Sequence, residues 1–422
     1  MVAKKCQLSR RRFLGGAAGG LVAPYFISSR VLGAGQVPPS DRVVTAVIGC
    51  GGRGMGLLNI RNDPRCVIAA VCDVDKDRMA AAQKRAGACD AYQDFRPILD
   101  RRDIDAVMTG TPDHWHAAIT VMSCQAGKDV YCEKPLCRTI EEGRKMVEAA
   151  RRYERVVQMG TQYRSIAVTR QACEWVRNGR FGKVSTVRLS HPSNPTYPNE
   201  PPSQPPPNLD WDLWLGPAPW APYHPKRCHF SFRYFMDYGS GYVADNGVHM
   251  FSVVSWAMGA DAIGPVKIEA TGRSEPNNNL YDVPVDLSVR LEFAEPQFEM
   301  IWEQPGKGKL DLEFAGSQAT LNGFWEFKVT QGQADLSPTR PDEIQLERSD
   351  DHFGNWLDCI ATRRRPVMDV ETGHRVTCWS HLGNIAYRLR RPLQWDPVAE
   401  RFPGDDEANR LLHVSYREPW RL

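Results

Sequence analysis

The residues from Gly49 to Gly54 form a hexapeptide with the G-x-G-x-x-G spacing of dinucleotide-binding turns. Gly49 permits the tight turn, Gly51 lets a pyrophosphate approach the backbone, and Gly54 allows the next helix to pack closely on the sheet. Gly52 and Arg53 open that helix, whose unpaired N–H groups attract phosphate. The spacing alone is a weak signal, but it stands between a β-rich run and a helical pattern, which is the context that the motif needs.

Asp73 lies 19 residues beyond the last of these glycines, at the end of the second β-rich run. An acid at this place accepts hydrogen bonds from the ribose hydroxyls of NAD and repels the additional phosphate of NADP. We therefore predict NAD as the cofactor, with NADP less favoured. The alternative is a plain strand-to-helix turn in which Asp73 caps a helix. The strand, the glycines, the helix and the acid taken together disfavour it.

Two polar segments follow the β-rich runs at 105–108 and 129–132, namely Thr111-Pro112-Asp113-His114-Trp115-His116 and Glu133-Lys134-Pro135. Both lie at the carboxyl ends of expected parallel strands, where open α/β sheets bind ligands. Read alone, the second segment is equally a charged turn. His114 and His116 have no third partner at zinc-like spacing, so no metal site is predicted. The cofactor contacts expected here are Thr111, Pro112, His116, Glu133 and Lys134.

Together with Asp245-Asn246-Gly247-Val248-His249, these segments resemble the Gfo/Idh/MocA family, the relatives of glucose–fructose oxidoreductase and inositol dehydrogenase. The resemblance covers nearly the whole chain after residue 35 and is strongest from the glycine motif to Leu136. It implies a nicotinamide site in which Lys134 lies beside the reacting carbon. It also places the Asp-x-x-x-His pair of the family's sugar dehydrogenases on Asp245 and His249.

The three residues that the resemblance makes catalytic, Lys134, Asp245 and His249, suit the oxidation of an alcohol. Asp245 and His249 are four residues apart, so they share one face if they lie at the start of a helix. A base must take the hydroxyl proton while hydride leaves the carbon, and histidine has a suitable unperturbed pKa of about 6.5. A free lysine has a pKa of about 10.4, so Lys134 needs burial or a neighbouring cation to share that work.

Two positions depart from the commonest family pattern. Asp113 stands where many relatives have asparagine, and Ser252 stands where an acid often follows the histidine by three residues. The region 208–220, with three tryptophans, and the late region 384–395 resemble the secreted, twin-arginine branch of the family. Tryptophans near a sugar site can stack on pyranose faces, and plain packing accounts for them equally well.

The pattern around these motifs predicts an α/β fold with two domains. Expected strands at 42–48, 67–72, 105–108, 129–132 and 156–159 alternate with expected helices at 53–61, 76–86, 95–100, 115–126 and 140–152. Such alternation predicts an N-terminal Rossmann domain, at 41–160, with a doubly wound parallel sheet. A proline-rich loop at 192–207, a helix at 247–258, short β-like runs at 266–329 and helices at 353–361 and 372–389 follow. We assign 161–422 to a substrate-binding and oligomerisation α/β domain with a mostly antiparallel open sheet. The resemblance implies that this sheet forms a dimer or tetramer interface.

The charge distribution argues against nucleic-acid binding. The chain has 422 residues and a formal net charge of +3, but residues 1–35 contain six basic residues and no acid. The rest contains 47 basic and 50 acidic residues, without the excess of positive charge that a nucleic-acid binder presents. No nucleic-acid partner is therefore expected, and the family resemblance implies a small-molecule carbohydrate instead.

Residues 1–35 have the organisation of an export signal. Ser9-Arg10-Arg11-Arg12-Phe13-Leu14 opens an uncharged stretch at 13–29, and small residues follow at 33–35. The arginine pair followed by Phe-Leu resembles the twin-arginine signal, whose substrates are exported already folded. We expect a periplasmic or otherwise exported protein that uses the twin-arginine machinery; a basic tail is the alternative. The twelve cysteines include no Cys-x-x-Cys pair. We expect free thiols, because a protein that folds in the reducing cytoplasm keeps its cysteines reduced.

Three functions remain open at this stage. The first is an exported oxidoreductase that moves hydride between tightly held NAD and a sugar, polyol or sugar derivative. The second is a glycoside hydrolase that uses NAD transiently, through oxidation at sugar C3, elimination, addition of water and reduction. The third is a non-catalytic binding protein, which the presence of Lys134, Asp245 and His249 together disfavours.

Replacing Arg10 and Arg11 with lysine should leave folded protein in the cytoplasm, because the export receptor reads the guanidinium pair as an address. Cell fractionation with an antibody to the chain measures this. Unchanged periplasmic delivery of the double variant would refute the export hypothesis.

Overall fold

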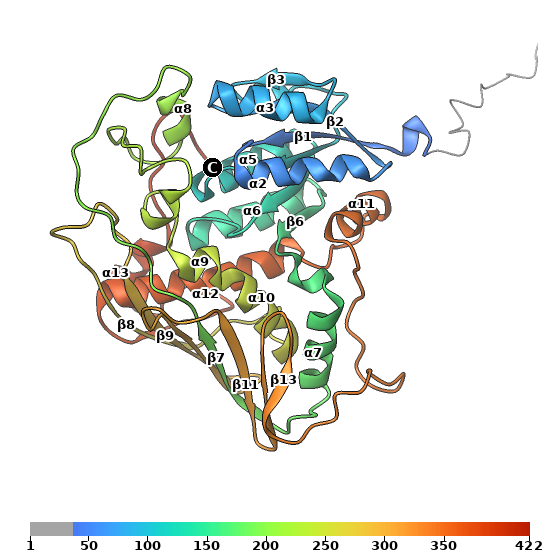
Figure 1. The fold of residues 1–422 in the computed structure, drawn as a ribbon, viewed down its shortest axis with the longest axis vertical. Helices are drawn as coiled ribbons and strands as arrows, with labels where there is room; N and C mark the ends of the chain where they lie inside the picture. The colour runs from blue at the N-terminus through green and yellow to red at the C-terminus, as the bar shows by residue number, and fades with distance from the viewer. Residues whose placement is uncertain (1–36) are drawn as a thin grey trace, which may run out of the picture. The chain divides into compact units, whose positions relative to one another are not determined.

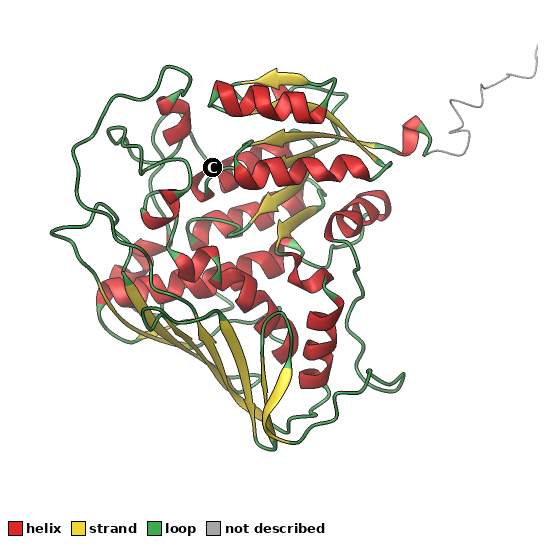
Figure 2. Ribbon diagram, viewed as in Figure 1, coloured by secondary structure: helices red, strands yellow, loops and turns green. Residues whose placement is uncertain are grey.

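The computed structural model describes residues 37–422, and the expected export signal at residues 1–35 lies outside the described residues. The chain divides into two compact units, residues 1–42 and 43–422. The described part of the first unit contains a short 3-10 helix, η1 (Pro39–Asp41). The second unit contains both sheets of the fold (Figure 1, Figure 2).

A parallel sheet of six strands has the order β3-β2-β1-β4-β5-β6, which is the strand order of a Rossmann fold. Its strands are β1 (Val43–Ile48), β2 (Cys66–Cys72), β3 (Asp90–Tyr92), β4 (Ala106–Thr109), β5 (Asp129–Glu133) and β6 (Val157–Gly160). β4 and β5 are buried along their whole length, as expected of central strands covered on both faces. β6, the last strand of the sheet, is also fully buried, and Gln158 in it forms a bridge with Asp369. The order reverses between β1 and β4, where doubly wound folds bind their ligands.

The helices of this half are α2 (Gly52–Leu57), α3 (Lys76–Ala86), α4 (Arg96–Leu99), α5 (Asp113–Gln125) and α6 (Ile140–Arg152), with the 3-10 helix η2 (Leu58–Asn62). Two of them, α3 and α6, begin at a side-chain cap. The Asp75 carboxylate accepts two backbone N–H groups at the start of α3, and Thr139 and Glu142 form a capping box at α6. The single helix predicted at 53–61 is instead two short elements, because glycine is a poor helix former and α2 contains three.

The second sheet has eight strands in the order β13-β12-β11-β7-β10-β9-β8-β14. Its strands are β7 (Val184–Ser190), β8 (Lys267–Arg273), β9 (Asp286–Phe293), β10 (Phe298–Glu303), β11 (Asp311–Gly316), β12 (Ala319–Asn322), β13 (Lys328–Gly332) and β14 (Leu393–Gln394). β7 and β10 are parallel, and the other neighbouring strands are antiparallel. The α/β fold class predicted from the sequence is confirmed. The sequence pattern did not predict β7, which buries apolar side chains on one face only.

Helices cover one face of this second sheet. They are α7 (Ala167–Arg177), α9 (Tyr242–Asp245), α10 (Gly247–Met258) and α12 (Val370–Leu389), and α12 contacts strands of both sheets (Figure 1). The remaining helices are α8 (Trp211–Leu215), α11 (His352–Thr362) and α13 (Asp406–Asn409), with the 3-10 helices η3 (Gln162–Ser165), η4 (Ser231–Tyr234) and η5 (Arg410–Leu412). Two late segments pack on the first sheet's core: α11 through Trp356, and the tail through Trp420.

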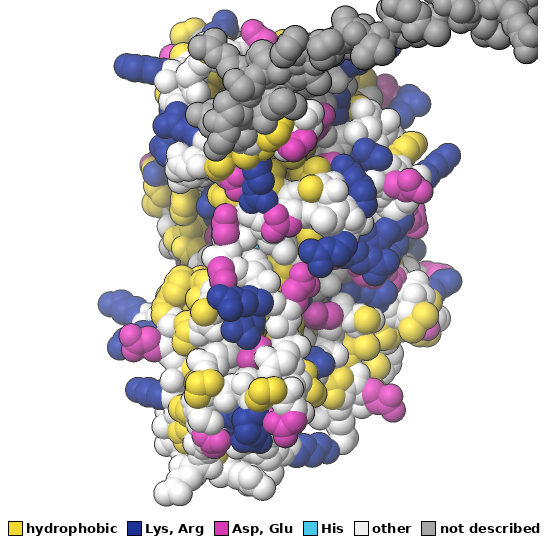
Figure 3. Space-filling view, turned by 90° about the vertical axis from the view of Figure 1, so that its right-hand side faces the viewer, with side chains coloured by type: hydrophobic (Ala, Val, Ile, Leu, Met, Phe, Trp, Pro, Cys, Tyr) yellow, Lys and Arg dark blue, Asp and Glu magenta, His cyan; other side chains and the backbone are white. Residues whose placement is uncertain are grey.

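The other face of the second sheet carries paired charges. Cross-strand ion pairs join Arg188 to Glu313, Lys267 to Glu292 and Arg290 to Glu299. A role for this face in a dimer or tetramer stays a prediction. On the side of the molecule shown in Figure 3, basic and acidic side chains are interspersed.

None of the helices in residues 37–422 combines the length and the apolar character needed to cross a membrane. In the same range, no three His, Cys, Asp or Glu side chains lie together as metal ligands would.

Candidate active site

The glycine turn between β1 and α2 has room for backbone only. Gly49 has a φ of +82°, and a Cβ atom there would lie 2.6 Å from the backbone nitrogen of Thr111. A Cβ atom on Gly54 would lie 1.7 Å from the carbonyl oxygen of Gly49. A Cβ on Gly51 would meet only the movable end of Arg78, and one on Gly52 would meet nothing. The first and last glycines are therefore required by the turn itself.

Asp73 fixes this turn to the end of β2. One carboxylate oxygen accepts the Cys50 N–H at 2.6 Å, and the other accepts the Asp75 N–H at 2.9 Å. Burial raises the pKa of Asp73, and these backbone hydrogen bonds oppose the rise. Two carboxylate oxygens have about four acceptor positions, so capacity remains for a ribose hydroxyl.

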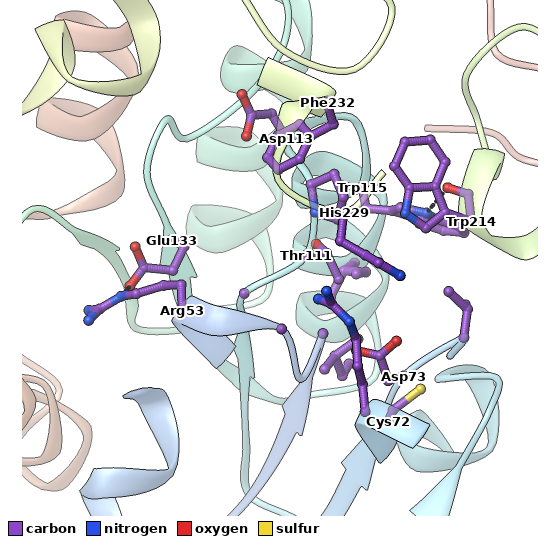
Figure 4. A pocket seen from close by; sticks show the side chains of 18 of the residues that line it. Arg53, Cys72, Asp73, Thr111, Asp113, Trp115, Glu133, Trp214, His229 and Phe232 are labelled. Atoms are coloured by element: carbon purple, nitrogen blue, oxygen red, sulfur yellow. Dashed lines mark hydrogen bonds and ion pairs between the residues drawn. The ribbon is translucent and has the colours of Figure 1, made fainter. Parts of the chain in front are cut away.

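A cavity of about 520 Å³ opens over the carboxyl ends of β1, β2, β4 and β5 (Figure 4). Nine of the eleven residues predicted to contact the cofactor line it: Gly49, Gly51, Gly52, Arg53, Asp73, Thr111, Pro112, Glu133 and Lys134. Gly54 does not line the cavity but packs on Gly49 and so shapes the turn. The residues fit a dinucleotide, because the glycine turn leaves space that side chains would fill and Asp73 presents a free acceptor.

His116 is the second predicted contact that does not line the cavity. Its ring is buried, with Nδ1 2.7 Å from the Pro135 carbonyl oxygen and Nε2 3.0 Å from the Thr111 carbonyl oxygen. Burial lowers the pKa of His116 to about 4. The residue thus links the two polar segments that follow β4 and β5.

Arg53 and Glu133 form one wall of the cavity (Figure 4). The guanidinium Nε lies 2.6 Å from a carboxylate oxygen of Glu133, which is almost fully buried. Burial raises the pKa of Glu133, and the charge of Arg53 opposes the rise. This pair holds the start of α2 against the end of β5.

Lys134 meets Asp245, which lies in α9 and comes from the second half of the chain. The Lys134 Nζ atom lies 2.6 Å from the Asp245 carboxylate and donates to the Asp245 carbonyl oxygen at 2.8 Å. Arg233 Nε lies 3.1 Å from the same carboxylate oxygen. Burial opposes ionisation of Asp245, but the charges of Lys134 and Arg233 lower its pKa to about 2. The carboxylate is therefore ionised throughout the physiological range.

His249 does not share a continuous helix with Asp245. α9 ends at Asp245 and α10 begins at Gly247, so the backbone breaks between the two predicted residues. The His249 ring packs edge-on against Tyr163 at 5.0 Å, and its Nδ1 atom is buried without a partner among the described residues. Burial and the charge of Lys134 lower the pKa of His249 well below its ordinary value. The imidazole is neutral and can accept a proton.

Ser252 and Asp113, the two departures from the family pattern, differ in their surroundings. The Ser252 hydroxyl is fully buried and donates to the carbonyl oxygen of His249 at 2.8 Å. It therefore belongs to the helix and not to the cavity wall. Asp113, the first residue of α5, lines the cavity.

Residues 208–233, here named the roof segment, complete the cavity. The sequence pattern did not predict that this segment lines the cofactor cavity. Leu213, Trp214, His229, Phe230, Phe232 and Arg233 line the cavity from this side. A cluster of buried aromatic residues holds the segment together. The density of aromatic residues was the available signal, but only the structure shows which surface they cover.

The roof segment is attached to the first sheet at the cavity rim. Leu209 forms an antiparallel bridge with Asp75, and the Asn208 side chain donates to the Asp75 carboxylate at 3.0 Å. His229 Nε2 lies 3.2 Å from the other carboxylate oxygen of Asp75. The indole N–H of Trp115 donates to the Trp214 carbonyl oxygen at 3.1 Å.

The C-terminal tail holds the roof segment from outside. The Arg417 side chain donates to the carbonyl oxygens of Gly216 at 3.0 Å and Asp212 at 2.8 Å, and it pairs with the Asp212 carboxylate. Trp420 packs edge-on against Trp115, with ring centroids 4.6 Å apart. Three stretches distant in sequence thus enclose one cavity.

Comparison with known proteins identifies both parts of the chain. Residues 43–161 match the family model described as the oxidoreductase family, NAD-binding Rossmann fold, and residues 197–422 match the model of the oxidoreductase family, C-terminal alpha/beta domain. The second match alone covers more than half of the chain. The cofactor of the first domain is NAD, as predicted.

Individual relatives match shorter stretches. Levoglucosan dehydrogenase from Pseudarthrobacter phenanthrenivorans is 32% identical over 118 residues, which are 28% of this chain and 30% of that protein. A glycosyl hydrolase family 109 protein from Shewanella pealeana is 29% identical over 158 residues, or 35% of each chain. The chain therefore spans about a third of the length of these relatives.

One solved structure resembles the fold over most of its length. The WlbA dehydrogenase from Bordetella pertussis, solved with NADH and UDP-GlcNAcA, superposes with a TM-score of 0.65 at 16% identity. The superposition covers 84% of this chain and 99% of WlbA. At that identity, the likeness shows a shared fold.

Asp73→Ser should narrow the preference of this protein for NAD over NADP, because the variant no longer repels the additional phosphate. The loss of hydrogen bonds to a charged acceptor costs about 1.5–3 kcal/mol, so the change should stay within roughly two orders of magnitude in Kd. Titration of cofactor fluorescence measures both affinities. Equal affinity of the wild-type protein for the two nucleotides would contradict this role.

Proposed function

This chain belongs to the Gfo/Idh/MocA family of oxidoreductases, and from its site we propose that it transfers hydride between NAD and a sugar, polyol or sugar derivative. The observation that carries the proposal is the 2.6 Å contact of Lys134 with Asp245 beside the cofactor cavity. It joins a residue from the end of a Rossmann strand to one from the second domain. NAD, when bound, supplies the hydride acceptor or donor.

The residues around this contact can handle the proton that accompanies hydride transfer. The neutral imidazole of His249 can accept the hydroxyl proton of an alcohol. Lys134 carries a positive charge, held by Asp245, that can stabilise negative charge developing on the substrate oxygen. The enclosing protein keeps these groups away from bulk water, so each interaction is stronger than it would be in solution.

Lys134→Ala and His249→Ala should each lower the turnover number about 10²–10⁴-fold, the usual contribution of a positioned acid or base. NAD affinity should change little, because the glycine turn and Asp73 hold the nucleotide elsewhere. Turnover is measured as NADH absorbance over a panel of sugars and polyols, and affinity by titration of cofactor fluorescence.

Lys145→Ala is the matched control, because Lys145 is a partly exposed lysine on α6, paired only with Glu141. It should retain wild-type turnover. A Lys134→Ala protein that binds NAD and turns over at the wild-type rate would remove Lys134 from the mechanism.

A second candidate is the NAD-dependent glycoside hydrolase, which the roof segment favours. A cofactor enclosed by the roof segment and the C-terminal tail is suited to a cycle in which hydride returns to the same substrate. Oxidation at C3 acidifies the C2 proton, the glycosidic bond leaves by elimination, water adds, and the ketone is reduced. This route needs no pair of carboxylates across the bond. The likeness to a glycosyl hydrolase family 109 protein supports it further.

The two candidates give different products from one experiment. The purified protein is incubated with NAD and a panel of glycosides, and both NADH and free sugar are measured. Net NADH indicates a dehydrogenase, whereas released sugar without net NADH indicates the hydrolase. Neither product from any substrate would argue for a binding protein without catalysis.

Arg417→Ala should speed the release of NAD, because it removes the contacts that hold the roof segment at Asp212 and Gly216. We expect a change on the order of tenfold, equivalent to about 1.4 kcal/mol. The measurement is the loss of bound NAD during dialysis or rapid dilution. Arg421→Ala, which removes an exposed cation from the same tail, is the control and should leave the rate unchanged. Equal rates of NAD release from wild type, Arg417→Ala and Arg421→Ala would show that the tail does not help to retain the cofactor.

Export by the twin-arginine route is also part of the proposal. The motif at Arg10–Arg12 supports it, and all eleven cysteines among the described residues are free thiols, as expected of a protein folded before export. An oligomer, a dimer or tetramer, is proposed from family membership. Sedimentation of the purified protein would test it.

A further inference from the structure

Asp113 is the one cavity-lining carboxyl group that accepts no hydrogen bond from another of the described residues; its one hydrogen bond is with its own backbone N–H group. Asp73 accepts two backbone N–H groups, Asp94 pairs with Arg96, and Glu133 pairs with Arg53. The residue Asp113 is only 5% exposed, so water does not freely replace the missing partner. Figure 4 shows its carboxyl group turned away from Asp73. A carboxyl group that lines a cavity and has no partner on another residue is free to interact with a bound molecule.

The charges around Asp113 come from three other elements. Lys134 from the end of β5 and Arg233 from η4 are cations, and Asp245 from α9 is an anion. The thiol of Cys132 is a further titratable group near it, and His114 follows Asp113 in α5. Burial and Asp245 raise the pKa of Asp113 to about 8, although Arg233 and Lys134 oppose the rise. The carboxyl is thus protonated at neutral pH, but a small change in local charge would ionise it.

The position of Asp113 in the fold assigns it to the nicotinamide half of the cofactor. In a Rossmann fold, the dinucleotide straddles the point where the strand order reverses, and the acid after the second strand marks the adenosine half. Here that acid is Asp73, after β2. Asp113 follows β4, beyond the reversal, and Lys134 follows β5 beside it. The nicotinamide ring has a positive charge when oxidised and none when reduced.

We propose that Asp113 is a redox-linked proton acceptor, ionised beside oxidised nicotinamide and protonated beside the reduced ring. The inference rests on the proposed function and adds a residue to its chemistry. A positive charge within about 4–6 Å lowers the pKa of a carboxyl group by 1–3 units. Oxidised nicotinamide would therefore bring the pKa of Asp113 below neutrality, and loss of the ring charge would restore it.

Proton and electrons then balance within the site. The substrate C–H bond breaks and its electron pair leaves with the hydride, so the alcohol carbon is oxidised and the nicotinamide reduced. The hydroxyl proton passes by way of Lys134, whose charge acts on Asp113, to the carboxylate of Asp113. In the opposite direction, Asp113 returns this proton by the same route to the alkoxide oxygen. An asparagine at this position could not take part in the exchange.

The experiment compares the binding of NAD⁺ and NADH to the full protein as pH is varied, and it needs no substrate. In wild type, the ratio Kd(NAD⁺)/Kd(NADH) should fall as pH rises, by up to tenfold per pH unit, because the NADH complex holds one more proton. The window runs from about pH 6 to about pH 8, between the two expected pKa values of Asp113. In Asp113→Asn, the ratio should not change with pH.

Asp94→Asn is the matched control, because Asp94 is another carboxyl that lines the cavity. It is paired with Arg96, which together with backbone hydrogen bonding lowers its pKa. The ratio should therefore keep the wild-type slope in this variant. Asp113→Ser, which also cannot ionise, repeats the test if Asp113→Asn does not fold.

A wild-type ratio that does not change with pH would overturn the inference. The same slope in wild type and in both Asp113 variants would overturn it too. Neither result affects the proposed function, which is decided separately by turnover on the sugar and glycoside panels. A protein that binds neither nucleotide would overturn both.

Discussion

The buried contact between Lys134 and Asp245 is the constraint on which the active site depends. Each side chain is about 13% exposed, so both charges have lost most of their water and are stabilised mainly by each other and by Arg233. Such a pair is costly to bury and more costly to break. It therefore requires the Rossmann sheet and the second domain to hold a fixed relation at this point. The hydride-transfer site forms only where they meet.

The cofactor cavity is likewise formed by parts of the chain that are distant in sequence. Its floor is the glycine turn and the strand ends, its cover is the roof segment, and the tail around Arg417 holds that cover in place. Asp75 links the floor to the cover, since it caps α3 and also contacts Asn208 and His229 of the roof segment. For the export that we propose, such a cover would help to keep NAD bound where little free nucleotide is available.

The electrostatics of the site separate groups that look alike in the sequence. Asp245 lies beside two cations and is ionised, whereas Asp113 lies beside that anion in a buried position and is near its point of ionisation. Burial also acts on His249: it disfavours the charged imidazole, so the ring is neutral. Such differences in environment allow one cavity to stabilise charge with some residues and exchange a proton with others.

The sequence by itself determined the Rossmann half, the cofactor and the cluster of motifs at the strand ends. Local patterns suffice there, because strand and helix periodicity and the glycine spacing are written within short stretches. Helices 76–86, 140–152 and 247–258 begin and end at the predicted residues. Only the tertiary structure decided that His116 links two loops instead of lining the cavity, that a break separates Asp245 from His249, and that the roof segment covers the cofactor cavity. The His116 ring nitrogens face the Pro135 and Thr111 carbonyl oxygens, and only the packed fold shows this. The position of the roof segment depends on contacts between residues about a hundred positions apart, such as Trp115 with Trp214, and local sequence carries no information about such pairs.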